Sequence, residues 1–301
     1  MGNSQSGEIL LKLDRINLIY LTNEIIRGNV LLTINERQLK IDEISICLTG
    51  EIGYTKTKLT VDGTGQSITT TDYKQIEFYS QKIPFLQRKT GENKLILSKG
   101  EYSWPFEITL INSLPPTLNQ YHSYPYVSYR LRITMNQSWY EPNRSQATFV
   151  TIYPFVDLQR NSLKTKFENE SGKDIQLKCI LDKLTYFPNE FIHMEMNLTN
   201  SKRLLIKQID FYLYQFYQIQ SNSKENLLFQ TTLPNLFNEK DEQIHRTFSI
   251  LIPSHVIPPT FRYQNERISV EINYYLRISV QLHRLFTHFD FDVPIRLVNK
   301  S

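Results

Sequence analysis

The sequence contains one pattern twice, and this duplication limits the fold more than any other feature. In each copy, a strand of alternating apolar and polar residues leads into a Pro-Pro-Thr triplet, and a second strand rich in aromatic and β-branched residues follows. The copies are residues 106–117 with 129–135, and residues 248–260 with 274–280. Because proline has no N–H to donate to a sheet, each triplet is expected to form a corner between two strands.

The duplication extends upstream of both corners. Residues 20–30 and 186–196 share the turn Tyr-x-x-Asn-Glu, and 39–44 correspond to 205–209. The sequence therefore predicts one domain present in two copies of about 150 residues each. The predicted organisation is a flexible leader at 1–7, a first domain at 8–160 and a second domain at 161–301, with a hinge at Val156, Asp157 and Leu158 before a polar linker.

Composition favours strands over helices. Glycine is scarce, with 10 residues, whereas tyrosine and phenylalanine number 18 and 17. The stretch 204–219 alternates apolar residues on both faces, with Tyr212, Tyr214 and Phe216 on one of them, which predicts a strand covered on both sides. We expect an all-β chain of two tandem Ig-like β-sandwiches.

The charge and the cysteine content argue against several classes of protein. The net charge of +4 is too small for a nucleic-acid-binding domain. Cys47 and Cys179 lie in apolar strand patterns, one in each half, and we interpret both as small buried hydrophobic residues. No metal or cofactor site is predicted. Without a long apolar run or a secretory signal, we expect an intracellular protein.

Residues 54–100 are weakly patterned and rich in turn signals and cations. We interpret them as a long basic loop, for which a solvated hairpin is the alternative. The candidate residues for binding an anionic partner, either a lipid headgroup or an acidic cargo tail, are Lys82, Arg88, Lys89 and Lys94.

Candidate catalytic residues do not converge on a motif. The histidines are scattered, with no nucleophile motif, no paired metal-ligand spacing and no phosphate-binding glycine loop beside them; those considered are His193, His245, His255, His283 and His288. We expect no enzymatic activity. An extracellular adhesion sandwich would need a signal peptide and usually a cysteine pair within each domain.

Several short motifs in a fixed order resemble arrestin-domain-containing proteins, the α-arrestins. Besides the two Asn-Glu turns, these motifs lie at residues 104–106, 114–117, 124–129, 156–158 and 293–295. The resemblance covers about residues 8–298. It implies two seven-stranded sandwiches joined by a short hinge, with concave faces that dock cargo.

The function implied by the resemblance is that of a non-catalytic adaptor in trafficking, endocytosis and signalling. The implied partners are the cytoplasmic parts of membrane receptors or transporters and the ubiquitin-ligase machinery. The usual Pro-Pro-x-Tyr motif is absent, and the nearest strings, at 115–118 and 258–261, lie in the corners. The alternative within the binding class is a retromer cargo-sorting subunit of the Vps26 type.

The first six residues fit the N-myristoylation pattern, with Gly2 as the acceptor and Ser6 at the favoured hydroxyl position. One myristoyl chain binds a bilayer only marginally, so a second signal, such as a basic surface, would be required. We expect a cytoplasmic protein with peripheral association at the plasma membrane or endosomes.

Overall fold

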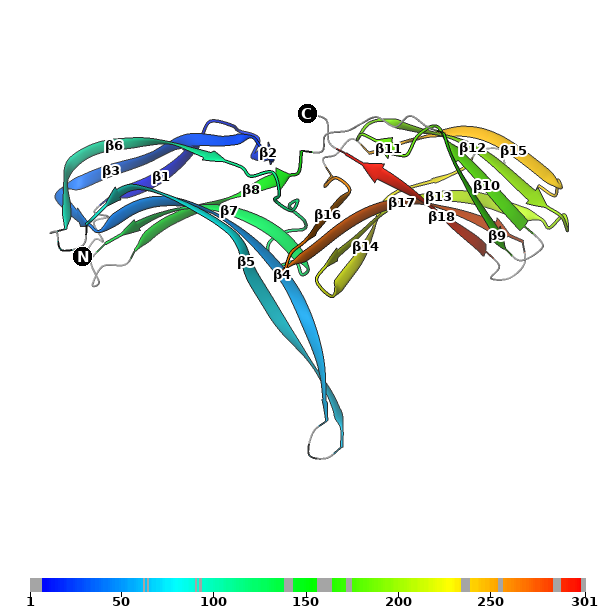
Figure 1. Ribbon diagram of the computed structural model, residues 1–301, viewed down its shortest axis with the longest axis horizontal. Coiled ribbons are helices and arrows are strands. Elements are labelled where there is room, and N and C mark those ends of the chain that lie inside the picture. The colour runs from blue at the N-terminus through cyan, green and yellow to red at the C-terminus, as the bar shows by residue number, and fades with distance from the viewer. Residues whose placement is uncertain are drawn as a thin grey trace. The chain divides into compact units, whose positions relative to one another are not determined.

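The computed structural model describes residues 7–61, 63, 65–89, 91, 94–137, 143–155, 164–171, 175–233, 239–253, 257–283 and 288–298. The chain divides into two compact units, Met1–Phe155 and Val156–Ser301 (Figure 1). The described residues form strands and connections, and they include no helix with the length and apolar character needed to cross a membrane. The predicted all-β class is confirmed.

The first unit consists of two sheets in which most neighbouring strands are antiparallel. One has the strand order β1-β3-β6, and the other has the order β2-β8-β7-β4-β5. The strands are β1 (Glu8–Leu13), β2 (Ile19–Leu21), β3 (Ile25–Ile41), β4 (Glu43–Val61), β5 (Ser67–Gln87), β6 (Leu95–Thr109), β7 (Tyr126–Asn136) and β8 (Arg144–Tyr153).

The second unit repeats this two-sheet arrangement. One sheet has the order β15-β12-β10-β9, and the other has the order β11-β18-β17-β13-β14, with β16 also paired to β17. The strands are β9 (Thr165–Ser171), β10 (Ile175–Leu181), β11 (Thr185–Tyr186), β12 (Phe191–Asn200), β13 (Ile206–Ile219), β14 (Asn222–Thr232), β15 (Gln243–Leu251), β16 (Phe261–Gln264), β17 (Ser269–Leu282) and β18 (His288–Leu297).

Alternating side chains fill the space between the sheets of each unit. In the first unit, Leu32 and Ile41 of β3 pack in one buried cluster with Ile44 of β4 and Met135 of β7, which belong to the opposite sheet. In the second unit, β13 and β15 belong to different sheets, and the rings of Phe211 and Phe248 lie with centroids 4.4 Å apart. Each unit is therefore a sandwich with its own apolar core.

The duplicated Pro-Pro-Thr corner makes the same hydrogen bonds in both units. In the first, the Thr117 amide donates to the carbonyl of Ile152 at 2.8 Å, and the Ile152 amide donates to the Thr117 hydroxyl oxygen at 2.9 Å. In the second, Thr260 makes the equivalent bonds with Leu297 at 2.7 and 2.9 Å. The predicted corners are confirmed. Through these bonds, each corner holds the chain that leaves one strand against the last strand of its unit.

The Asn-Glu turns are also equivalent. Asn23 and Asn189 have φ angles of 71° and 62°, in the left-handed region that asparagine tolerates. In both turns the glutamate that follows closes the loop, because its carboxylate accepts a 2.9 Å bond from the backbone amide three residues earlier.

Three interpretations of the sequence need correction. Residues 54–100 are mostly strand, because β4, β5 and the start of β6 occupy them, so the hairpin alternative holds. In β13, the face that carries Tyr212, Tyr214 and Phe216 is only half-buried, so this strand is not covered on both sides. Cys179 is buried as expected, but Cys47 is only half-buried, because it lies on the outward face of β4, where Ser80 of the neighbouring strand is 3.4 Å from its sulfur.

Candidate functional site

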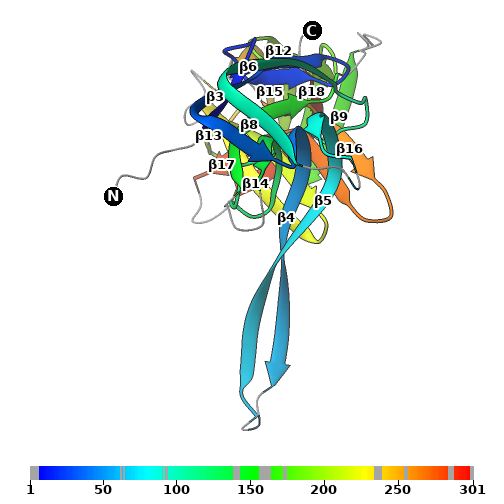
Figure 2. The ribbon, with the colours of Figure 1, turned by 90° about the vertical axis from the view of Figure 1, so that its left-hand side faces the viewer.

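The β4–β5 hairpin extends beyond the sheet that supports it. Strand β7 pairs with β4 only from Glu43 to Gly53, whereas β5 pairs with β4 as far as Val61. Beyond Gly53 the described residues form a two-stranded ribbon, which Figures 1 and 2 show running away from the rest of the first unit. The side chains on both faces of the ribbon are largely exposed, so both faces are open to a partner.

One face of the ribbon, which we call the apolar face, carries three exposed apolar side chains among threonine and serine residues. Successive side chains of a strand point to opposite faces, so Leu59 and Val61 of β4 lie on the same face as Tyr73 of β5, which is the register partner of Thr55. These three side chains are 69%, 66% and 67% exposed. Isolated exposed apolar residues are ordinary, but three on one uncovered ribbon face are typical of a contact surface.

The opposite face is basic and carries Lys56, Lys58 and Lys74, with Asp72 between them. The Lys58 ammonium lies 2.9 Å from the Asp72 carboxylate, and the Lys74 ammonium lies 3.8 Å from it. The hydrogen bond from Lys58 lowers the pKa of Asp72 and raises that of Lys58, so both groups are charged at neutral pH. Three cations against one carboxylate leave this face positive.

The four cations chosen from the sequence lie elsewhere in the first unit. Lys82 is in β5 and pairs with Glu43 at 2.7 Å, and Arg88 follows β5 and lies 3.4 Å from Asp42. Lys89 is exposed and Lys94 is half-buried, both between β5 and β6. Carboxylates therefore offset the charges of Lys82 and Arg88, and a role for the four residues in binding an anionic partner stays a prediction.

Sequence reasoning missed the lysine face, although a signal for it was present. Residues 56–61 alternate lysine or threonine with threonine, leucine or valine, and Asp-Gly-Thr-Gly follows directly. Alternation over β-branched residues followed by a glycine turn is the pattern of a hairpin. The other predicted sites, Gly2 and the hinge residues Val156, Asp157 and Leu158, lie outside the described residues.

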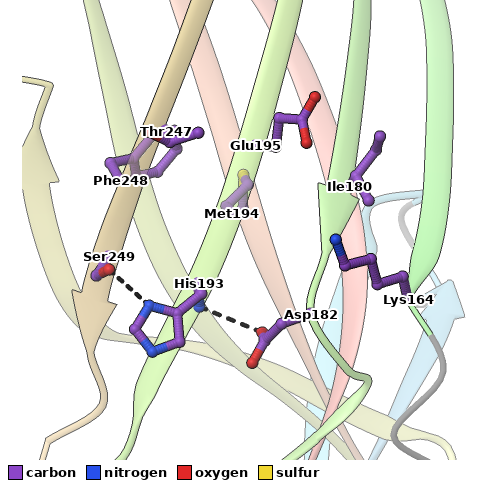
Figure 3. A pocket seen from close by; sticks show the side chains of 9 residues that line it. All are labelled: Lys164, Ile180, Asp182, His193, Met194, Glu195, Thr247, Phe248 and Ser249. Carbon is purple, nitrogen blue, oxygen red and sulfur yellow. Dashed lines mark hydrogen bonds between the residues drawn. The ribbon is translucent and has the colours of Figure 1, made fainter.

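An open pocket of about 280 Å³ lies on the sheet of β9, β10, β12 and β15 in the second unit (Figure 3). Its polar lining includes His193, whose ring nitrogen Nδ1 lies 2.7 Å from the Ser249 hydroxyl oxygen. The Asp182 carboxylate accepts a 3.3 Å bond from the backbone amide of His193 and a 2.7 Å bond from the Tyr186 hydroxyl.

This arrangement differs from a serine-hydrolase site. In such a site the carboxylate holds the ring of the histidine, whereas here it holds the backbone and a tyrosine. The hydrogen bond from Tyr186 also holds Asp182, which lines the pocket. Burial and the contact with Asp182 raise the pKa of the Tyr186 hydroxyl. Within the described ranges, no group of three or more His, Cys, Asp or Glu side chains is arranged to hold a metal ion.

Comparison with known families agrees with the two-sandwich architecture. Residues 9–159 match the model of the arrestin (or S-antigen) N-terminal domain, and residues 171–301 match that of the arrestin (or S-antigen) C-terminal domain. The chain belongs to the arrestin family. Arrestin-family proteins are generally non-catalytic, and their domains generally bind receptor or cargo proteins, so an adaptor or scaffold role is indicated.

A curated relative of this arrestin-family chain is "Arrestin domain-containing protein C" from Dictyostelium discoideum. The two sequences are 21% identical over 207 residues, which cover 64% of this chain and 30% of that protein. The chain therefore spans about a third of the relative's length.

Proposed function

We propose that the protein is a non-catalytic adaptor that binds the cytoplasmic parts of membrane receptors or transporters in trafficking, endocytosis and signalling. Its place is cytoplasmic, with peripheral association at the plasma membrane or endosomes. The observation that carries the proposal is the β4–β5 hairpin, which presents an apolar face and a lysine face beyond the sandwich.

The hairpin has the chemistry that contact with membrane-embedded cargo requires. Lys56, Lys58 and Lys74 suit the anionic cytoplasmic leaflet, which attracts basic segments that lie near its surface. Leu59 and Val61 at the far end of β4, with Tyr73 on the same face, offer apolar contacts. Because the exposed charges are screened by salt, the electrostatic part of the association weakens as ionic strength rises.

Proximity labelling in intact cells tests the proposal. The tagged full chain is compared with two variants. In the first, serine replaces Leu59, Val61 and Tyr73, and in the second, serine replaces Lys56 and Lys58. The matched control is Ile96→Ser with Ile111→Ser, since these side chains are 56% and 46% exposed in the same unit but lie off the hairpin.

The parent and the control are expected to label integral membrane proteins, and both hairpin variants are expected to lose most of that labelling. If the hairpin variants label the same membrane proteins as the parent, the hairpin is not the cargo contact. Co-purification with a large helical-solenoid partner would instead favour the alternative of a Vps26-type retromer subunit.

A further inference from the structure

The outward face of the β13–β14–β17 sheet carries a surface that we call the tyrosine face, made of Tyr212, Tyr214, Phe216, Leu227 and Tyr275. Tyr214 lies opposite Tyr275 of β17 on one side and Leu227 of β14 on the other. The four aromatic side chains are half-buried, and Leu227 is 49% exposed. Burial alternates along β13, with the core on its other side, so these side chains point away from the sandwich interior.

The rings of the tyrosine face are ordered by stacking. Tyr212 and Tyr214 have centroids 6.1 Å apart with ring planes 30° apart, and Tyr214 and Tyr275 have centroids 5.3 Å apart at 23°. The Arg277 guanidinium lies over two of them, 5.1 Å from the centroid of Tyr214 and 5.3 Å from that of Tyr275. The protein thus already seats one guanidinium on these rings, at a distance typical of cation–π contacts.

Carboxylates surround this surface. Asp292 holds Arg277 through two bonds, of 2.7 Å to Nε and 2.9 Å to an Nη, and this contact raises the pKa of the guanidinium. Glu225 accepts a hydrogen bond from the Tyr275 hydroxyl, and Asp290 of β18 lies opposite Ser279 in the next row. Three exposed carboxylates, one each in the rows of Phe216, Tyr212 and Ser279, therefore stand around the guanidinium of Arg277.

The charge balance changes beyond these rows. Arg262 of β16 lies opposite Glu271 of β17, and Arg296 lies near the end of β18. Glu271 lies opposite Gln218, so Arg262 stands past Phe216. Arg296 follows Ile295, the partner of Tyr274, so it stands outside the tyrosine rows on the side of Phe216. The negative potential is therefore local to the rings of Tyr212, Tyr214 and Tyr275.

We propose that the tyrosine face binds an extended, arginine-rich segment of a partner protein. A guanidinium can stack on an aromatic ring while its N–H groups bond a carboxylate, which Arg277 does here with Tyr214 and Asp292. In an extended peptide, alternate side chains stand ~6.6 Å apart, close to the spacing of the Tyr212 and Tyr214 rings. An anionic bilayer would be repelled by the same carboxylates.

This inference concerns the second unit and does not depend on the β4–β5 hairpin. The test uses the full chain and a fluorescein-labelled peptide of five Arg-Ser repeats, followed by fluorescence anisotropy. A peptide of five Glu-Ser repeats is the charge-reversed probe. The face variant combines Glu225→Gln, Leu227→Ser and Asp290→Asn, and the control variant combines Glu168→Gln with Glu266→Gln, two exposed acids of the same unit that lie off the face.

The arginine peptide is expected to bind the parent and the control with the same affinity. Its affinity for the face variant is expected to be lower by about tenfold or more, and its affinity for the parent should fall as the salt concentration rises. Thermal unfolding of each variant shows whether it is folded as the parent is. As a second readout, Tyr212→Leu keeps an apolar side chain but removes one stacking ring, and is expected to weaken binding as well. The proposal is overturned if the glutamate peptide binds as tightly, or if the folded face variant binds the arginine peptide as the parent does.

Discussion

The hydroxyl group of Tyr129 donates a 2.6 Å hydrogen bond to the carbonyl oxygen of Pro115. In the second unit, Tyr274 makes the equivalent bond to Pro258 at 2.5 Å. Both tyrosines are almost completely buried, so each proline carbonyl accepts its hydrogen bond inside the protein. The donor lies on a strand that follows the proline in the sequence. The bond therefore ties each double-proline corner to its own sandwich.

Replacing Tyr129 by phenylalanine is expected to lower the free energy of unfolding of the first unit by about 1–3 kcal/mol, because the buried Pro115 carbonyl loses its donor. Urea unfolding measures the change. Tyr73→Phe is the control, since that side chain is 67% exposed. Equal midpoints for the two variants would show that the corner bond contributes nothing to stability.

Gly53 is expected to resist substitution. A Cβ atom at this position would lie 2.1 Å from Cε1 of Tyr126, whose hydroxyl group donates to Glu51 at 2.5 Å and accepts from Gln75 at 2.9 Å. Because these bonds hold the ring in place, Gly53→Ala is expected to destabilise the first unit by about 1–3 kcal/mol through overpacking.

Gly63 provides the matched control for that substitution. It belongs to the same hairpin, and a Cβ atom there would meet nothing within 4 Å. Thermal unfolding should separate the two variants, with Gly63→Ala close to the parent. A Gly53→Ala protein as stable as the control would mean that the Tyr126 ring moves aside freely.

The two cysteines are expected to react differently. Burial raises the pKa of Cys179 to about 12, so at pH 8 only about one thiol in 10⁴ is a thiolate. Iodoacetamide should modify the half-buried Cys47 in the native protein and both cysteines after denaturation, as peptide mass spectrometry would show. Rapid labelling of Cys179 in the native protein would contradict this burial.

The same shift gives a pH dependence with a definite sign. An unfolded thiol ionises near its ordinary pKa of about 8.5, whereas folded Cys179 keeps its proton up to about 12. The contribution of this thiol to stability is therefore complete below pH 8.5 and is lost as the pH rises toward 12.

Sequence alone predicted the elements that local chemistry determines. The Pro-Pro-Thr corners and the left-handed Asn23 and Asn189 follow from the missing N–H of proline and the tolerance of asparagine for positive φ. The extent of β13 burial could not be read in this way. An apolar face predicts burial only if something covers it, and the covering element is set by the tertiary fold.

The candidate site was predicted only in outline. A basic, exposed region between residues 54 and 100 was expected. The choice of Lys82 and Arg88 did not take into account their partners Glu43 and Asp42, which are far from them in the sequence. Pairing across a hairpin depends on its register, and register in turn depends on where the turn falls. Placing the turn at residues 62–66 would have put Lys58 beside Asp72.

Myristoylation of Gly2 stays a prediction, because the leader lies outside the described residues. Intact-mass spectrometry of protein made in a eukaryotic cell should show loss of Met1 and gain of one myristoyl group. Imaging of Gly2→Ala should then show weaker membrane association. An unmodified N-terminus, or a variant that stays at membranes as the parent does, would end this proposal.

The adaptor account is tested most directly by a photo-crosslinking amino acid placed at Leu59, on the apolar face of the hairpin, in cells that make the full chain. The same amino acid at Ile96, which is 56% exposed on β6 of the same unit, serves as the reference. The account predicts that irradiation links integral membrane proteins to position 59 and few or none to position 96. Membrane proteins captured equally at both positions, or at neither, would contradict it.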